Sequence, residues 1–302
     1  MTASLFSRLG TRRALLAGCL VLLAVTVTGC SGNYSVRPQF FWDSLFHPSP
    51  AIVNGLGLTL GISVVAQFLG VVLGVFAAMG KMAKFWPFRT VANIYIWIFR
   101  GTPLLVQLSF FYYGLAAAGL FKWPAIVIGP VDILPNIFAG IVILGVNEGA
   151  YMAEIVRAGI LSVDPGQTEA SKSLGMTYGQ TMRRIVLPQA ARVIVPPLGN
   201  EFNNMLKTTS LLTVISVFEL YNTFSVAAGH SYATFELMAA AAVWYLLLTT
   251  IWGFVQSRIE RRLARGTGTG SSGPSGPQGP GWRSRFFGRS NVDAKASGLG
   301  GH

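Results

Sequence analysis

The sequence has few of the side chains with which enzymes and metal proteins do their chemistry. Its 302 residues include two cysteines and three histidines. Cys19 and Cys30 lie in no disulfide or metal-ligand spacing, and the histidines (His47, His230 and His302) lie outside the apolar runs. No nucleophile beside a base and no carboxylate pair outside those runs is present. We therefore predict a protein that is not an enzyme and that has no metal site and no catalytic residue.

A phosphate-binding loop of the form G-x-x-x-x-G-K-[ST] is also absent, so this chain cannot by itself hydrolyse ATP. Charge is scarce as well. Charged residues make up 11% of the chain and hydrophobic residues 52%, with a mean hydropathy of +0.52. This composition argues against a soluble protein and predicts an all-α polytopic membrane protein.

The charges that are present are mostly positive. Lysine and arginine number 23 against 11 acidic residues, which gives a net charge of +12. They lie between and after the apolar runs rather than in a patch interleaved with aromatic residues, which argues against nucleic-acid binding. The loops on one side of the predicted topology hold only Arg37 and Lys122. The positive-inside rule therefore places the other side, and the C-terminus, in the cytoplasm.

Several apolar stretches are long enough to cross a membrane as helices. The first has no charge, and its glycines would let neighbouring helices pack closely. The second is interrupted at Arg100-Gly101-Thr102-Pro103, where Pro103 breaks the helix. We expect irregular backbone around Pro196 and Pro197 and around the cluster Lys207-Thr208-Thr209-Ser210, and an external segment at 222–234. The predicted spans are residues 51–80, 91–121, 136–160, 191–221 and 235–255.

Both ends of the chain are expected to lie outside this five-helix core. Residues 1–30 are either a cleaved signal or an uncleaved first membrane helix. Val27-Thr28-Gly29-Cys30 matches a lipobox, in which Cys30 would be lipidated. We interpret residues 31–50 as an external interfacial segment, residues 51–262 as the transmembrane domain, and residues 266–302 as a disordered Gly/Ser/Pro-rich cytoplasmic tail.

Ionisable residues at membrane depth are functional candidates, because exposing them to lipid costs several kcal/mol. Glu154 and Arg157 are three residues apart on one helix face, so we interpret them as a structural ion pair. Glu148, with Asn147 and Tyr151, lies nearer the middle of its span, where polar groups would face a substrate path.

A second polar group follows in the fourth span. The run from Asn200 to Asn204 cannot wholly face lipid, so its members either line a cavity or bridge helices. Lys207 has either a bound carboxylate or Glu201 as its partner. Both signs of charge are present, so charge alone does not decide the solute. The candidates for a translocation path are Asn147, Glu148, Tyr151, Glu201 and Lys207.

The longest polar stretch between the spans runs from Glu169 to Pro188 and carries a family resemblance. Small residues (Ala170, Ser171 and Gly175) would let another backbone approach closely, and Pro188 would start or bend the next helix. The stretch resembles the EAA loop of ATP-binding-cassette importer permeases, with Ser171 where the family usually has a second alanine. The matching positions are Glu169, Ala170, Gly175, Ile185, Leu187 and Pro188. In that family the loop forms a coupling helix that docks on an ATPase subunit.

Other segments narrow the resemblance to the polar-amino-acid branch of these permeases. They are Arg100–Gln107, Tyr151 with Glu154, Arg157 and Gly159, Gly166-Gln167, and Lys207–Leu211. The similarity covers about residues 52–262 and implies the five-helix core of a type I importer in the bacterial inner membrane. It also implies a second, like or related permease, two ATPase subunits that bind ATP and Mg²⁺, and an external solute-binding protein. The implied solute is glutamate, glutamine or a basic amino acid, moved by alternating access.

Two other classes of protein stay open on the sequence. An ion-coupled secondary transporter or channel would use the buried carboxylates and would move its solute without ATP. A lipid-anchored or membrane-anchored interaction protein is suggested only by Cys30, and it would need no charged groups in its later spans.

Overall fold

The computed structural model describes residues 35–128 and 131–264 of the chain. The N-terminal segment with Cys30 and the Gly/Ser/Pro-rich tail from residue 266 lie outside the described residues. The described residues up to Glu260 belong to one compact unit.

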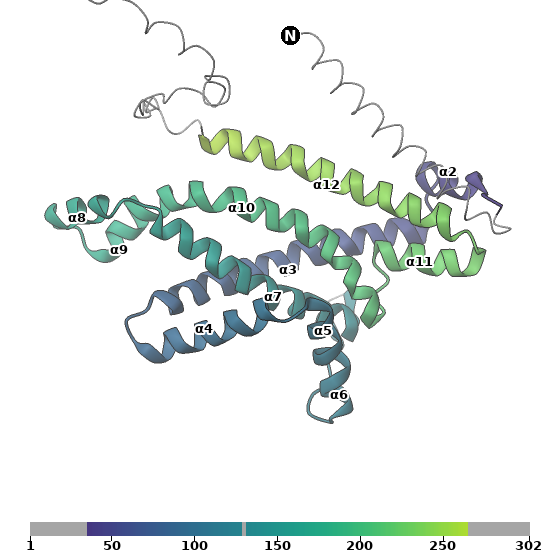
Figure 1. Cartoon of the computed structure of the whole chain (residues 1–302), viewed down its shortest axis with the longest axis horizontal. Helices are drawn as coiled ribbons and strands as arrows, with labels where there is room; N and C mark the ends of the chain where they lie inside the picture. The colour runs from purple at the N-terminus through teal and green to yellow at the C-terminus, as the bar shows by residue number, and fades with distance from the viewer. Residues whose placement is uncertain (1–34, 129–130, 265–302) are drawn as a thin grey trace, which may run out of the picture. The chain divides into compact units, whose positions relative to one another are not determined.

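Helices dominate this part of the chain (Figure 1). Along the sequence they are α2 (Pro38–Phe46), α3 (Pro50–Met82), α4 (Trp86–Gly101), α5 (Leu104–Ser109), the π-helical turn η1 (Phe110–Gly114), α6 (Leu115–Ala117), α7 (Pro135–Leu161), α8 (Pro165–Ser173), α9 (Tyr178–Thr181), the π-helical turn η2 (Met182–Val186), α10 (Leu187–Thr208), the 3-10 segment η3 (Thr209–Ile215), α11 (Leu220–Ser231) and α12 (Thr234–Ala264). Two short strands, β1 (Ile126–Ile128) and β2 (Val131–Ile133), pair antiparallel between α6 and α7.

The membrane spans follow the predicted pattern. Three helices of the described part, α3, α7 and α12, are each long and apolar enough to cross a membrane, and five spans result if each bent pair of helices counts as one. The first pair bends by 104° between α4 and α5, at the break predicted for Pro103. The second bends by 51° between η3 and α11.

The prediction of irregular backbone in the fourth span is wrong at the prolines and confirmed at the Lys207–Ser210 cluster. Pro196 and Pro197 lie inside the continuous helix α10, whereas the α-helix ends at Thr208 and gives way to the 3-10 segment η3 within the predicted cluster. Prolines are tolerated in membrane helices where a neighbour satisfies nearby carbonyl groups. Gln256 of α12 donates to the Pro196 carbonyl (3.3 Å) and Trp252 of α12 to the Gly199 carbonyl (2.8 Å), so α12 holds α10 next to the two prolines.

Both segments predicted as external contain a helix. Most of residues 222–234 form α11, whose first turn is capped by the buried Glu219 carboxylate. The predicted interfacial segment contains α2, whose Trp42 and Phe46 rings are stacked and exposed. Trp244 of α12 donates to the Ser44 carbonyl and so fastens α2 to the last span.

The core is centred on the contact between α3 and α7, which lie side by side (Figure 1). A Cβ at Gly70 would lie 2.6 Å from the Glu148 Cγ, so this glycine lets α7 approach α3 at the level of Glu148. Gly57 and Gly61 do not have this role, because no atom lies within 4 Å of a Cβ placed there.

Candidate translocation cavity and coupling segment

The five residues singled out for a translocation path line one cavity of about 620 Å³. Its wall comes from α5, α7, α10 and η3, segments that are far apart in the sequence. Apolar side chains (Leu104, Leu144, Met205 and Leu211) complete the lining. Polar groups from α7 and α10 are thus gathered on one hollow, and a cavity is where polar groups of membrane helices are tolerated.

Glu148 is the most deeply buried charged group of the cavity, with 6% of the residue exposed. The Nε2 of Gln67, on α3, donates to the Glu148 Oε1 at 3.0 Å and also contacts the Met152 sulfur. In the part of the chain that the structure describes, no lysine or arginine pairs with Glu148. Sequence reasoning missed Gln67, because nothing in the first span indicates that it faces the third.

Asn147 has a structural task besides lining the cavity. Its Nδ2 donates to the Phe99 carbonyl and to the Gln107 Oε1, both at 3.0 Å. Gln107 in turn donates to the carbonyls of Phe99 and Thr102. These amides satisfy the carbonyl groups that the break before Pro103 leaves without helical partners. The break in the second span is therefore held by the third.

Arg100 ends α4 beside the cavity. Its guanidinium lies over the Tyr151 ring, 5.3 Å from the ring centre. Tyr151 lines the cavity, so this cation–π contact places a positive charge at the margin of the path.

The polar run of α10 divides between the two roles left open by the sequence. Asn200 accepts a hydrogen bond from Gln256 (3.1 Å) and so bridges to α12, while Glu201 and Asn204 line the cavity. Glu201 and Lys207 form no ion pair with each other in the described chain. Lys207 is exposed into the cavity.

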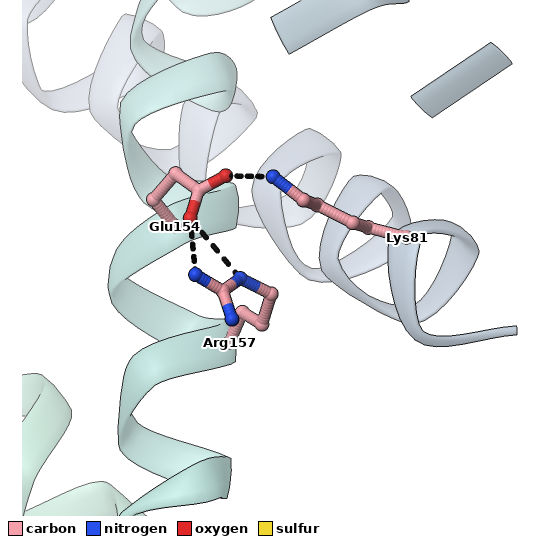
Figure 2. A network of polar contacts seen from close by, with 3 residues as sticks. All are labelled: Lys81, Glu154 and Arg157. Atoms are coloured by element: carbon pink, nitrogen blue, oxygen red, sulfur yellow. Dashed lines mark hydrogen bonds and ion pairs between the residues drawn. The ribbon is translucent and has the colours of Figure 1, made fainter. Parts of the chain in front are cut away.

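A network of three charged side chains lies at the C-terminal end of α3 (Figure 2). Arg157 donates to the Glu154 Oε2 through Nε (3.1 Å) and Nη2 (2.9 Å), which is the pair that their spacing predicts. Lys81 of α3 also pairs with Glu154, a partner that the sequence did not indicate. The network thus joins α3 to α7. Among the described residues, no three potential ligands of the His, Cys, Asp and Glu types come together, so none of these clusters could hold a metal.

The predicted coupling segment is a helix–turn–helix rather than one helix. Asp164 caps α8, Gly175 forms the turn in a left-handed conformation (φ 74°), and Thr177 with Gln180 makes a capping box on α9. Glu169, Ala170, Leu174 and Tyr178 are exposed, the last two by 81% and 74%. Ile185 is half-buried in η2, and Leu187 and Pro188 begin α10. An exposed apolar turn between two capped helices is a surface suited to docking.

The prediction that Ser171 offers space to another backbone is wrong. Ser171 is buried between α8 and α9, and its hydroxyl lies 2.8 Å from the buried Thr181 hydroxyl. Ser171 donates to the Thr168 carbonyl at 2.8 Å, so Thr181 is the donor to Ser171. The hydroxyl pair joins the two helices of the coupling segment from inside.

We expect non-additive effects when this hydroxyl pair is removed. Ser171→Ala leaves the Thr181 hydroxyl buried without a partner, which costs about 1–3 kcal/mol. The double variant S171A/T181V has no unpaired hydroxyl at this position, so its contact between α8 and α9 should open less often than that of S171A alone. Hydrogen exchange of residues 165–181 in the purified protein measures this opening. Equal protection in S171A and S171A/T181V would contradict the pairing.

An open polar cavity between apolar helices suits a membrane transport protein. Comparison with known proteins gives the family. Residues 70–265 match the model of the binding-protein-dependent transport system inner membrane component. The chain therefore belongs to this family of transporter permeases. It is a transport subunit of the inner membrane, and ATP hydrolysis lies on a separate chain.

The chain is similar to several curated amino-acid permeases. It is 44% identical to the arginine transport system permease protein ArgU of Corynebacterium glutamicum, over 69% of this chain and 67% of that one. It is 36% identical to the arginine transport system permease protein ArtQ of Bacillus subtilis, over 71% of this chain and 93% of ArtQ. It is 35% identical to the glutamine transport system permease protein GlnP of Escherichia coli K12, over 74% of this chain and 98% of GlnP.

Solved structures show the same fold. One of these is a crystal structure of an amino acid ABC transporter with histidines. Its chain aligns with 76% of this chain and over 100% of its own length, with a TM-score of 0.66 and 38% identity. A chain of the inward-facing MetNI methionine ABC transporter matches 70% of this chain and 96% of its own length, with a TM-score of 0.57. Its identity of 22% supports the fold alone. The type I importer core predicted from the sequence is confirmed, and an ion-coupled transporter is not favoured.

Proposed function

We propose that this permease conducts cationic amino acids of the arginine type through the cavity of α5, α7, α10 and η3. The observation that carries the proposal is Glu148, a buried carboxylate that faces the cavity with only the neutral Gln67 as its partner. A buried charge without a counter-ion is costly, and a cationic solute would supply one. Similarity to two arginine permeases supports the same class of solute.

The charges around the cavity suit an amino acid with a second positive group. Lys207 is unpaired with any acidic side chain of the described residues and would bind the α-carboxylate. One of the two glutamates would bind the α-ammonium group. The other remains for a cationic side chain, while Arg100 is turned toward the Tyr151 ring at the margin. A glutamate side chain would instead meet Glu148 or Glu201 with like charge.

The partners follow from the family and from the exposed coupling segment. We propose that the chain pairs with a second permease, like or related, and works with two ATP-binding subunits and an external binding protein. The ATP-binding subunits would hold ATP and Mg²⁺ and would contact the exposed turn around Leu174 and Gly175. This arrangement places the coupling segment and the C-terminus in the cytoplasm, as the positive-inside rule predicts.

Uptake into proteoliposomes that contain the whole transporter tests the solute class. We expect labelled arginine to accumulate only with ATP inside, and unlabelled lysine to compete with it. Glutamate in equal excess should leave arginine uptake unchanged, because its side-chain carboxylate would join those of Glu148 and Glu201 in the cavity. Stronger competition by glutamate or glutamine than by lysine would overturn the assignment of a cationic solute.

A further inference from the structure

A second cavity lies between α3 and α4 and reaches Val146 of α7, and it shares no lining residue with the first. It has a volume of about 560 Å³, within the range of roughly 300–1,000 Å³ that is typical of small-molecule sites. Its lining is apolar and includes Phe76 and Ala77 of α3 and Phe88 and Val91 of α4. The one polar side chain, Tyr95, donates its hydroxyl to the Val146 carbonyl. The cavity therefore offers a ligand hydrocarbon contacts only.

The cations at one end of this cavity set it apart from a plain apolar groove. Gly80 and Pro87 line the cavity at the α3–α4 turn, and Lys84 lies in that turn. Arg89 follows the lining residue Phe88. Lys84 and Arg89 are exposed, and neither forms an ion pair within the described part of the chain. By contrast Lys81, one turn earlier, is paired with Glu154.

Aromatic side chains surround the same end. Phe85, Trp86 and Phe88 are each about 60% exposed (59%, 65% and 61%). Tryptophan and other aromatic residues gather at the level of lipid headgroups, so this turn has the composition of a membrane–water interface. The apolar slot thus has exposed aromatic residues and two cations without an ion pair among the described residues at or next to its α3–α4 turn.

We propose that this site binds an anionic phospholipid, with an acyl chain in the α3–α4 cavity and the phosphate on Lys84 and Arg89. Basic sites between membrane helices on the cytoplasmic side suit anionic headgroups, and that leaflet carries the anionic lipids. The assignment of the leaflet rests on the topology proposed above. The bound chain would brace α4 against α7, because the Tyr95 hydroxyl already joins the cavity wall to Val146, next to Asn147 and Glu148.

Thermal unfolding of the purified permease in detergent tests the site without any transport assay. We expect phosphatidylglycerol to raise the Tm by about 4 °C, and phosphatidylcholine with the same acyl chains to raise it by less than about 1 °C. The double variant K84Q/R89Q should lose the difference between the two lipids, whereas the control Lys122→Gln, a lysine of the predicted external side, should keep it. Ala77→Phe, which fills the slot, should lose the shift while keeping both cations.

Several results would overturn the proposal. Equal shifts with both lipids, or an undiminished phosphatidylglycerol shift in K84Q/R89Q, would show that the cations select no headgroup. A full shift with glycerol phosphate alone would assign them to a soluble phosphate. If A77F lowers the fraction of permease dimer and leaves the lipid shift intact, a second copy of the chain fills the slot. A permease that fails to import arginine but shows the selective shift would refute only the proposed function.

Discussion

Gly175→Leu is expected to reduce uptake at least a hundredfold while the protein stays in the membrane. Gly175 has a φ of +74°, a conformation that costs a residue with a side chain about 1–2 kcal/mol. The leucine would also project from the exposed turn that carries Leu174 and leads to Tyr178, where the ATP-binding subunit is proposed to dock. Uptake of arginine and ATP hydrolysis stimulated by the binding protein should fall together.

The chain supplies a matched control for this variant. Gly119 has nearly the same conformation (φ +69°) and equally open surroundings, but it follows α6, away from the coupling segment. Gly119→Leu therefore imposes the same backbone strain and should leave uptake close to normal. Gly175→Asn, which tolerates this conformation, should retain more activity than Gly175→Leu. Normal uptake by G175L would refute the coupling role of residues 169–188.

Glu148→Gln is expected to lower arginine uptake about ten- to a hundredfold. A hydrogen bond to a charged group contributes about 1.5–3 kcal/mol, and each 1.4 kcal/mol is about a tenfold change. Gln67 can still donate to the amide oxygen of a glutamine at this position, so the contact between α3 and α7 is kept. The loss should therefore lie in transport and not in the amount of folded permease, which gel filtration measures.

Two further carboxylates show whether burial decides the effect. Asp132→Asn changes an exposed residue of the strand pair and should have no effect on uptake. Glu201→Gln should have a smaller effect than E148Q, because Glu201 is only half-buried and water screens its charge. Equal arginine uptake by E148Q and the unaltered permease would exclude Glu148 as a solute contact.

Several features of the site could be predicted because they depend on neighbours along the chain. The break at Pro103 follows from a proline inside an apolar run, and the Glu154–Arg157 pair follows from helical spacing. The polar residues of the fourth span, among them Glu201 and Lys207, were identified as candidates because polar groups are costly at membrane depth. That argument identifies candidates, but it does not say which of them face the same cavity.

The errors and omissions concern contacts between segments far apart in the sequence. Ser171 was interpreted by its size, but the position of α9 buries it against Thr181. Pro196 and Pro197 predicted an irregular helix, but α12 supplies the donors that stabilise α10 there. Gln67 and Lys81 had no signal at all, because a helix in an apolar run gives no indication of which neighbour each of its faces meets.

The amino-acid sequence by itself determined the membrane spans and the family, and it predicted the position of the coupling segment. These depend on local hydropathy and on short fixed spacings of residues, both of which can be evaluated without knowing how the helices pack. Only the tertiary structure decided that Asn147, Glu148, Tyr151, Glu201 and Lys207 share one cavity, and that no lysine or arginine of the described residues forms an ion pair with Glu148. Both depend on how α7 and α10 are packed together, which is set by long-range contacts that no single segment encodes.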